Sequence, residues 1–208
     1  MFTSKELRIL DLFRKDPFAC RTISELMREV KTDSYSWTHA AVKKLSREHI
    51  LTLEKKGQCQ LCTINFNEQK TLAYFALLEE LSAQSKKIPN LGKILSLMPP
   101  EFHILMIAGS YADGTFRDDS DLDVVVVIES KEERKWLLNE LVSAGDLMTP
   151  QLHPYVFTRE EFMEMLTNRE ANYGKEIERK HLVVSGAEPY FLLLREAVRD
   201  GYRRHAVS

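Results

Sequence analysis

Two aspartates one residue apart, preceded by a Gly-Ser pair, are the residues of this chain best suited to chemistry. Gly109-Ser110 follows one apolar run, and Asp121-Leu122-Asp123 opens a second. Side chains two residues apart in a strand share a face, so we expect the two carboxylates side by side at the edge of a buried sheet. They repel each other unless a cation lies between them, and Mg²⁺ suits such oxygen ligands together with substrate phosphates. Gly109 lets the backbone approach a phosphate, and Ser110 adds a hydroxyl and an N–H.

Ten residues separate Ser110 from Asp121. With this spacing, residues 100–190 resemble the minimal nucleotidyltransferases of the DNA polymerase β-type superfamily, whose signature is Gly-Ser-x10-Asp-x-Asp. The resemblance implies that Gly109 and Ser110 hold the triphosphate of an NTP substrate. It also implies that Asp121 and Asp123 are catalytic and bind Mg²⁺, in a site that can take two metals. A plain solvated turn is the alternative, but four aspartates within six residues would give such a turn only mutual repulsion.

Active members of that family place a third carboxylate on the next strand, where it binds metal and helps to activate the attacking hydroxyl. In this sequence the position falls at about Gln151 or His153, and neither residue is acidic. Gln151 offers weak metal coordination, His153 offers a base near neutral pH, and a simple surface role stays open for both. The sequence favours an enzyme but does not identify the third catalytic acid.

Apolar periodicity predicts the elements that must position this site. A short helix over residues 90–98, begun by Asn90, should precede them. Strands are expected over residues 103–108, 122–128 and 151–157, and helices over residues 132–142, 158–166 and 188–199. Thr158-Arg-Glu-Glu161 is a capping-box pattern that begins the second of these helices. We therefore expect an α+β fold whose C-terminal part is a polymerase β-like mixed sheet covered by helices.

Residues 1–66 predict three helices followed by a β-hairpin. Capping boxes begin the first helix at Thr3 and the second at Thr22, and the third runs from Asp33 or Ser34 to about His49. The order resembles a winged helix-turn-helix domain, in which the third helix enters the DNA major groove and the wing touches the backbone. The resemblance implies the following DNA contacts: Ser36, His39, Lys43, Arg47, Lys55 and Lys56. A protein-docking role or an ordinary solvated face stays open, and we expect Trp37 and Phe66 in the core.

The predicted domains are residues 1–68, a helical connector over residues 69–90, and residues 91–208. The connector should form a helix over residues 71–87 whose apolar stripe docks between domains or subunits; its members are Tyr74, Leu77, Leu78 and Leu81. Lys and Arg outnumber Asp and Glu 13 to 9 in residues 1–70, and are outnumbered 16 to 22 afterwards. A mildly basic front half suits a polyanionic partner.

The composition also indicates the cellular compartment of the protein. No apolar stretch approaches the roughly 20 residues of a membrane span, and the N-terminus lacks a signal-peptide pattern, so we expect a cytoplasmic protein without a membrane partner. Cys59 and Cys62 form a C-x-x-C pair in an expected strand, where positions three apart face opposite sides. Small strand residues are therefore favoured over a metal or redox site.

Together these observations predict a Mg²⁺-dependent nucleotidyltransferase that moves NMP from NTP to an acceptor hydroxyl and is linked to a DNA-binding winged helix. One alternative, favoured by the missing third acid, is a DNA-binding transcriptional regulator whose transferase domain senses nucleotide with little or no turnover. Another is an antitoxin-like nucleotidyltransferase acting on a protein partner, against which the winged helix counts. The expected partners are an NTP and double-stranded DNA, and a homodimer is allowed because winged helices often bind two half-sites.

Overall fold

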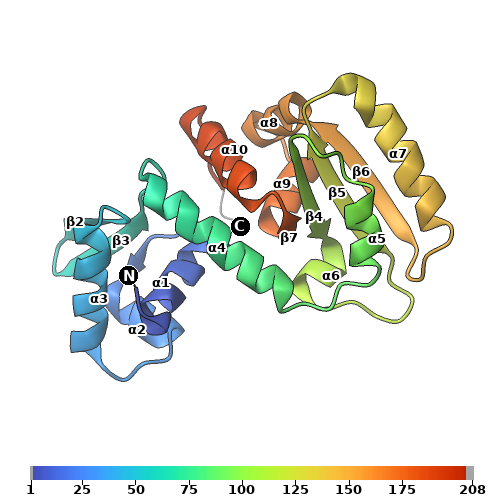
Figure 1. Cartoon of the computed structure of the whole chain (residues 1–208). Coiled ribbons are helices and arrows are strands. Elements are labelled where there is room, and N and C mark those ends of the chain that lie inside the picture. Colours follow the sequence, from blue (N-terminus) through green and yellow to red (C-terminus); the bar gives the residue numbers. More distant parts are fainter. Residues whose placement is uncertain (1, 205–208) are drawn as a thin grey trace. The chain divides into compact units, whose positions relative to one another are not determined.

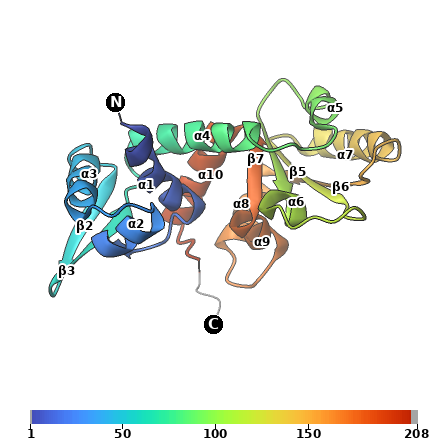
Figure 2. The same cartoon turned by 90° about the horizontal axis from the view of Figure 1, so that it is seen from below.

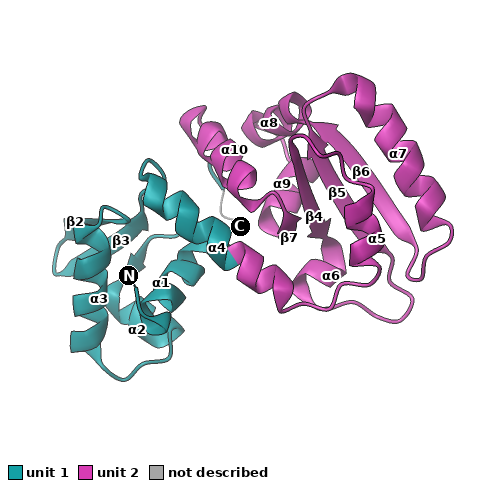
Figure 3. Ribbon diagram, viewed as in Figure 1, with its two compact units in different colours: residues 1–78, 203–208 teal, residues 79–202 magenta. Residues whose placement is uncertain are grey.

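The structure, a computed structural model, describes residues 2–204 of the 208-residue chain. The described residues fall into two compact units, one within residues 1–78 and 203–208 and one within residues 79–202 (Figure 3). Each unit has its own β-sheet and its own buried apolar residues. No helix within residues 2–204 is long and apolar enough to cross a membrane.

Three helices form most of the first unit: α1 (Ser4–Lys15), α2 (Ile23–Glu29) and α3 (Tyr35–Arg47). The predicted capping boxes at Thr3 and Thr22 are confirmed. Each threonine hydroxyl accepts from the backbone N–H of the glutamate three residues on, and the carboxylate of that glutamate accepts from the backbone N–H of the threonine. Ser34 caps α3 by accepting from the backbone N–H of Trp37. The helices bury a common apolar core: Ile9, Leu10, Phe13, Leu26 and Leu45.

An antiparallel sheet completes this unit: β1 (Arg21–Thr22), β2 (Leu51–Lys56) and β3 (Cys59–Ile64), in the order β1-β3-β2. The predicted hairpin is present, with Lys56 paired to Cys59 and Gly57 in the left-handed region at φ +62°, as a two-residue turn requires. Cys59 is exposed and Cys62 is buried, and both are free thiols. β1 was not predicted, because two residues carry no alternation.

Trp37 and Phe66 are only half-buried, so the prediction that they lie in the core was too strong. The buried face of α3 begins one position further along, at Thr38, and continues through Ala41 and Val42. Helix α4 (Gln69–Gln84) is exposed along part of the stripe that was predicted to dock between domains or subunits. Its buried face is formed by Leu72, Phe75, Ala76 and Glu79, whereas Leu77 and Leu81 of the predicted stripe are about half exposed. Apolar side chains line both faces of α4, so periodicity could not select the buried one.

The second unit is built on a four-stranded sheet of order β6-β5-β4-β7 (Figure 1). Its strands are β4 (His103–Ala108), β5 (Leu122–Ile128), β6 (Leu152–Thr158) and β7 (His181–Ser185). β4 runs antiparallel to both β5 and β7, and β5 runs parallel to β6. The mixed sheet and its first three strands were predicted, and β7 was not.

Six helices belong to this sheet: α5 (Leu91–Ser96), α6 (Gly109–Asp113), α7 (Lys131–Gly145), α8 (Arg159–Thr167), α9 (Tyr173–Arg179) and α10 (Ala187–Arg199). The capping box of α8 at Thr158 is confirmed. Asn90 precedes α5 as predicted, but its side chain donates to the carbonyl of Thr149 instead of capping the helix. Trp136 of α7 is 56 % exposed.

The two faces of the sheet receive different helices. Val124 and Val126 of β5 point to the face that buries Ile94 of α5 and Leu137 of α7. On the other face, Tyr155 of β6 contacts Tyr173 of α9, and Phe157 contacts Phe162 of α8. Figure 2 shows α8 and α9 on the opposite side of the sheet from α5 and α7. Because side chains alternate along a strand, Asp121 and Asp123 belong to the α8 and α9 face.

Candidate functional site

All four strands of the second unit bring an end to the same edge of the sheet. β4 ends there at Ala108, β7 begins beside it at His181, and β5 and β6 begin together at the pair of Leu122 and Leu152. Helix α6, which follows β4 directly, lies at this edge (Figure 1). Residues that are 72 positions apart in the sequence, such as Gly109 and His181, therefore meet at one place.

Gly109 occupies a position that only glycine fills without strain. Its φ of +63° lies in the left-handed region, and a Cβ placed on it would collide with Oδ2 of Asp123. The sequence predicted a close approach of this backbone to a phosphate. Among the described residues, the Asp123 carboxylate occupies the space beside Gly109 that a side chain at this position would fill. Ser110 follows within α6 and is half-buried.

Asp121 and Asp123 lie side by side as predicted, and His153 joins them from β6. The register pairs Asp123 directly with His153. Nδ1 of His153 is 3.8 Å from Oδ1 of Asp123, and Nε2 is 3.7 Å from Oδ2 of Asp121. Gln151 contributes its carbonyl oxygen to the sheet, where it accepts from the N–H of Leu122 at 2.9 Å. Of the two candidates for the third position, the structure brings His153 to the aspartates.

The environment of Asp123 opposes its ionisation. Burial raises the pKa of the Asp123 carboxyl, nearby His153 opposes this increase, and Asp121 adds a repulsion that raises the pKa further. Burial also raises the pKa of the Tyr173 hydroxyl, with smaller contributions from Tyr155 and Asp123. A half-buried carboxylate beside a second carboxylate is a group that a divalent cation would stabilise.

The donor set fits one hard divalent cation. Asp121 and Asp123 offer carboxylate oxygens from one strand face, which is the pairing that Mg²⁺ takes together with phosphate oxygens. Within residues 2–204, no three Asp, Glu, His or Cys side chains are arranged to hold a metal ion. The two ring nitrogens of His153 are directed to different aspartates and do not converge on a common point.

A comparison with protein families agrees with this geometry. Residues 105–202 match the nucleotidyltransferase domain family. The match begins within β4 and includes Gly109, Ser110, Asp121, Asp123 and His153. Residues 105–202 are called the nucleotidyltransferase domain below.

Other comparisons add little. The search of curated proteins gave no match. One solved structure, described as the crystal structure of a toxin-antitoxin with AMP-PNP, is 17 % identical, with a TM-score of 0.34 over 53 % of this chain and 84 % of that one. So low a score supports no conclusion about this protein.

Cationic side chains of the nucleotidyltransferase domain differ in how close they come to the site. Lys180 immediately precedes β7 and is 70 % exposed, with Nζ 3.8 Å from Oδ2 of Asp113 in α6. Lys175 of α9 instead donates to the carbonyls of Asn168 and Glu170, in the segment that precedes this helix. Lys180 is therefore better placed than Lys175 to meet a bound anion.

Two site neighbours escaped the sequence analysis. Tyr155 and Tyr173 have ring centroids 4.6 Å apart, and Asp123 contributes to the raised pKa of Tyr173. The alternation of β6 could have indicated Tyr155, because it lies two residues after His153 and shares its face. Nothing in the sequence indicates Tyr173, because α9 was not predicted.

In the first unit, the predicted DNA-contact residues are on the surface. On α3, Ser36, Lys43 and Arg47 are exposed, and His39 is half-buried with its ring stacked 6.2 Å from that of Tyr35. Lys55 and Lys56 are exposed at the hairpin tip. All six thus remain available to a partner.

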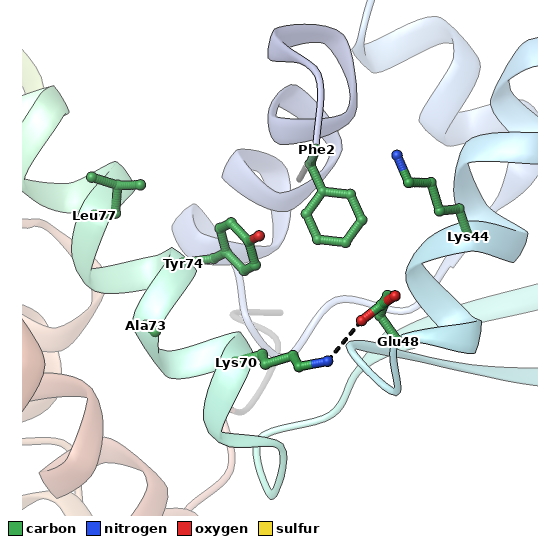
Figure 4. A pocket seen from close by; sticks show the side chains of 7 residues that line it. All are labelled: Phe2, Lys44, Glu48, Lys70, Ala73, Tyr74 and Leu77. Carbon is green, nitrogen blue, oxygen red and sulfur yellow. Dashed lines mark hydrogen bonds and ion pairs between the residues drawn. The ribbon is translucent and has the colours of Figure 1, made fainter.

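A separate hollow of about 400 Å³ lies on the first unit (Figure 4). Its lining is Phe2, Lys44, Glu48, Lys70, Ala73, Tyr74 and Leu77. Lys70 is bonded to Glu48 at 2.7 Å, and Lys44 to Glu6 at 3.0 Å. Its cations are thus paired with acids.

Proposed function

We propose that the nucleotidyltransferase domain binds a nucleoside triphosphate with Mg²⁺ and transfers its NMP group to an acceptor hydroxyl, releasing pyrophosphate. The observation that supports this proposal is the meeting of Gly109 with Asp121 and Asp123 at one sheet edge, within the residues that match the family. Glycine is needed there because any side chain would displace the Asp123 carboxylate.

Each residue has a role in this scheme. Asp121 and Asp123 would hold the cation, which when bound neutralises charge on the phosphates. The backbone of Gly109 and the hydroxyl of Ser110 would contact the triphosphate. Lys180 would add a charge-assisted bond to a phosphate oxygen, since its ammonium group is mostly exposed and its nearest acid is 3.8 Å away.

A second candidate function is nucleotide sensing with weak or no turnover. The observation that favours it is His153, which stands beside both aspartates from the neighbouring strand, where active members of the family carry an acid. Binding of the nucleotide needs only the residues already named, whereas activation of the acceptor hydroxyl needs a further group.

For the first unit we propose double-stranded DNA binding in the manner of a winged helix. Support comes from three helices and a hairpin in the expected order and from the exposed polar residues on α3. Lys55 and Lys56 at the hairpin tip would contact phosphates, which position a protein without reading sequence.

Transfer is tested by incubating the protein with each α-labelled NTP and Mg²⁺, with and without duplex DNA and cell lysate. The double variant Asp121→Ala/Asp123→Ala should lose all transfer. Its matched control is Asp118→Ala/Asp119→Ala, which removes the same charge from exposed positions of the same segment and should keep it. Equal loss in both variants would refute the assigned roles.

The labelled species also distinguishes the proposals. Labelled nucleic acid or small molecule would name the acceptor of a transferase, and a labelled protein would favour the antitoxin-like alternative. Nucleotide binding that depends on Asp121 and Asp123, without any transfer, would favour a sensor.

DNA binding is tested by measuring affinity for duplex DNA as a function of salt. Lys55→Ala/Lys56→Ala should reduce the slope of log K against log salt by about 2, because each phosphate contact contributes roughly 0.9. Lys86→Ala/Lys87→Ala removes the same charge from exposed positions of the second unit and should leave the slope unchanged. Equal slopes in both variants and wild type would exclude the hairpin as a DNA contact.

A further inference from the structure

His153 lies beside the two carboxylates that would hold a cation. It is the side chain that β6 places opposite Asp123, and its ring reaches both aspartates at 3.7 and 3.8 Å. It therefore occupies the place beside the carboxylates from which a third ligand would act. More than half of its surface is exposed, so a different side chain would fit there without disturbing the core.

The ring can serve as one ligand at most. Nε2 lies 3.7 Å from Asp121 and Nδ1 lies 3.8 Å from Asp123, and a histidine meets a given cation through a single nitrogen. Residues 2–204 contain no converging set of three metal-binding side chains.

The charge that the protein supplies sets the second limit. Its two carboxylates balance a single divalent cation, and the phosphates of a bound nucleotide add the same charge whatever residue stands at position 153. A second cation at the usual 3.5–4 Å separation of paired catalytic metals repels the first roughly four times as strongly as two unit charges would. A further anionic ligand on the neighbouring strand would offset this repulsion, and imidazole carries no negative charge.

Other nearby acids are engaged elsewhere. Asp113 accepts from the hydroxyl and the N–H of Thr115 and lies beside Lys180. Glu129, at the other end of β5, lies beside Arg159. Neither is placed to replace the missing ligand.

We propose that this nucleotidyltransferase domain holds one divalent cation with its nucleotide, and that a second does not bind because residue 153 is a histidine and supplies no carboxylate. The proposal rests on the proposed nucleotide site and refines it. The chain would then bind the nucleotide with one cation, and any transfer would proceed without a second cation position to activate the acceptor hydroxyl. Replacement of His153 by an acid creates that position.

The test counts Mn²⁺ ions per protein by electron paramagnetic resonance, with the α,β-methylene analogues of ATP and GTP at saturation. Wild type should bind one Mn²⁺ per bound nucleotide. His153→Asp should bind two, and the close pair should broaden the Mn²⁺ signal. His153→Asn, which has the same shape as aspartate without its charge, should bind one. His153→Glu provides a second acidic variant should His153→Asp fail to fold.

Each outcome decides the matter. Two Mn²⁺ ions in wild type, or one in every folded acidic variant, overturns the proposal while leaving nucleotide binding intact. Failure of wild type to bind either nucleotide analogue overturns the proposed function itself, and is seen in the same titration. Two ions in His153→Asn would show that removing the ring, and not adding a charge, opens the second position, which also overturns it.

Discussion

Replacement of Gly109 by alanine tests whether the site depends on the space beside Asp123. The substitution has two effects that can be separated. The first is backbone strain, since φ is +63° and a left-handed conformation costs an L-residue about 1–2 kcal/mol. The second is a collision of the new methyl group with Oδ2 of Asp123, which forces that side chain off its preferred rotamer at about 0.5–1.5 kcal/mol.

Gly114 provides a control within the same unit. Its φ is +80°, and a Cβ on it would meet only Nζ of Lys86 at 3.8 Å, an ordinary contact. Gly114→Ala should therefore show the strain alone, about 1–2 kcal/mol. Gly109→Ala should lose roughly 1.5–3.5 kcal/mol, the sum of its two effects. Thermal unfolding followed by circular dichroism measures the difference.

The loss of binding should be comparable in free energy to the loss of stability. A displaced Asp123 removes a charged contact worth about 1.5–3 kcal/mol, which corresponds to roughly tenfold to hundredfold weaker binding of a Mn²⁺–nucleotide complex. Gly114→Ala should bind as wild type does. If both folded variants bind the complex with the same affinity, the geometry assigned to Asp123 is wrong.

Three further results are expected. Burial raises the pKa of Asp123, so the folded state holds the proton more tightly than the unfolded state, and stability falls as pH rises through the interval from the ordinary aspartate pKa to the raised one. Asp123→Asn should therefore melt at a higher temperature than wild type at neutral pH without divalent cations. This advantage should disappear in acid, and added Mn²⁺–nucleotide should reverse it. Iodoacetamide at pH 8 should alkylate Cys20 and Cys59 but spare buried Cys62, whose pKa burial raises to about 11, and mass spectrometry should show the third adduct only after denaturation. Glu79→Ala should destabilise the second unit by about 1–3 kcal/mol in a denaturant titration, because Oε1 of Glu79 accepts from the buried N–H of Val183 at 3.0 Å. Glu79→Gln keeps an acceptor and should lose less stability in the same titration.

Local signals predicted the elements that have them. The capping boxes at Thr3, Thr22 and Thr158 each placed a helix start correctly, because hydroxyl and carboxylate groups three residues apart satisfy the free N–H groups of a first turn. The continuous apolar run of β5 predicted a central strand. β7 and α9 were missed because they are short, at five and seven residues, and so few positions cannot separate a helical from a strand pattern.

For the candidate site, the sequence predicted the strand carrying Asp121 and Asp123 but not everything around it. The alternation rule placed the two aspartates on one face, and the structure agrees. Which residue of β6 would join them depended on the register between two strands about 30 residues apart in the sequence, and nothing local determines a register. The sequence therefore left Gln151 and His153 as equal candidates, and the pairing of Asp123 with His153 selects one of them.

The position of His153 also bears on how such a domain changes over generations. The codons of histidine, CAU and CAC, differ from those of aspartate, GAU and GAC, only in the first base. A single point mutation at residue 153 would therefore place a carboxylate opposite Asp123, on a strand whose pairing is already in register and at a side chain that is more than half exposed. Forms of the domain with and without a carboxylate at this position would then be adjacent genotypes, and a selection for faster transfer in a library of random mutants should recover that change.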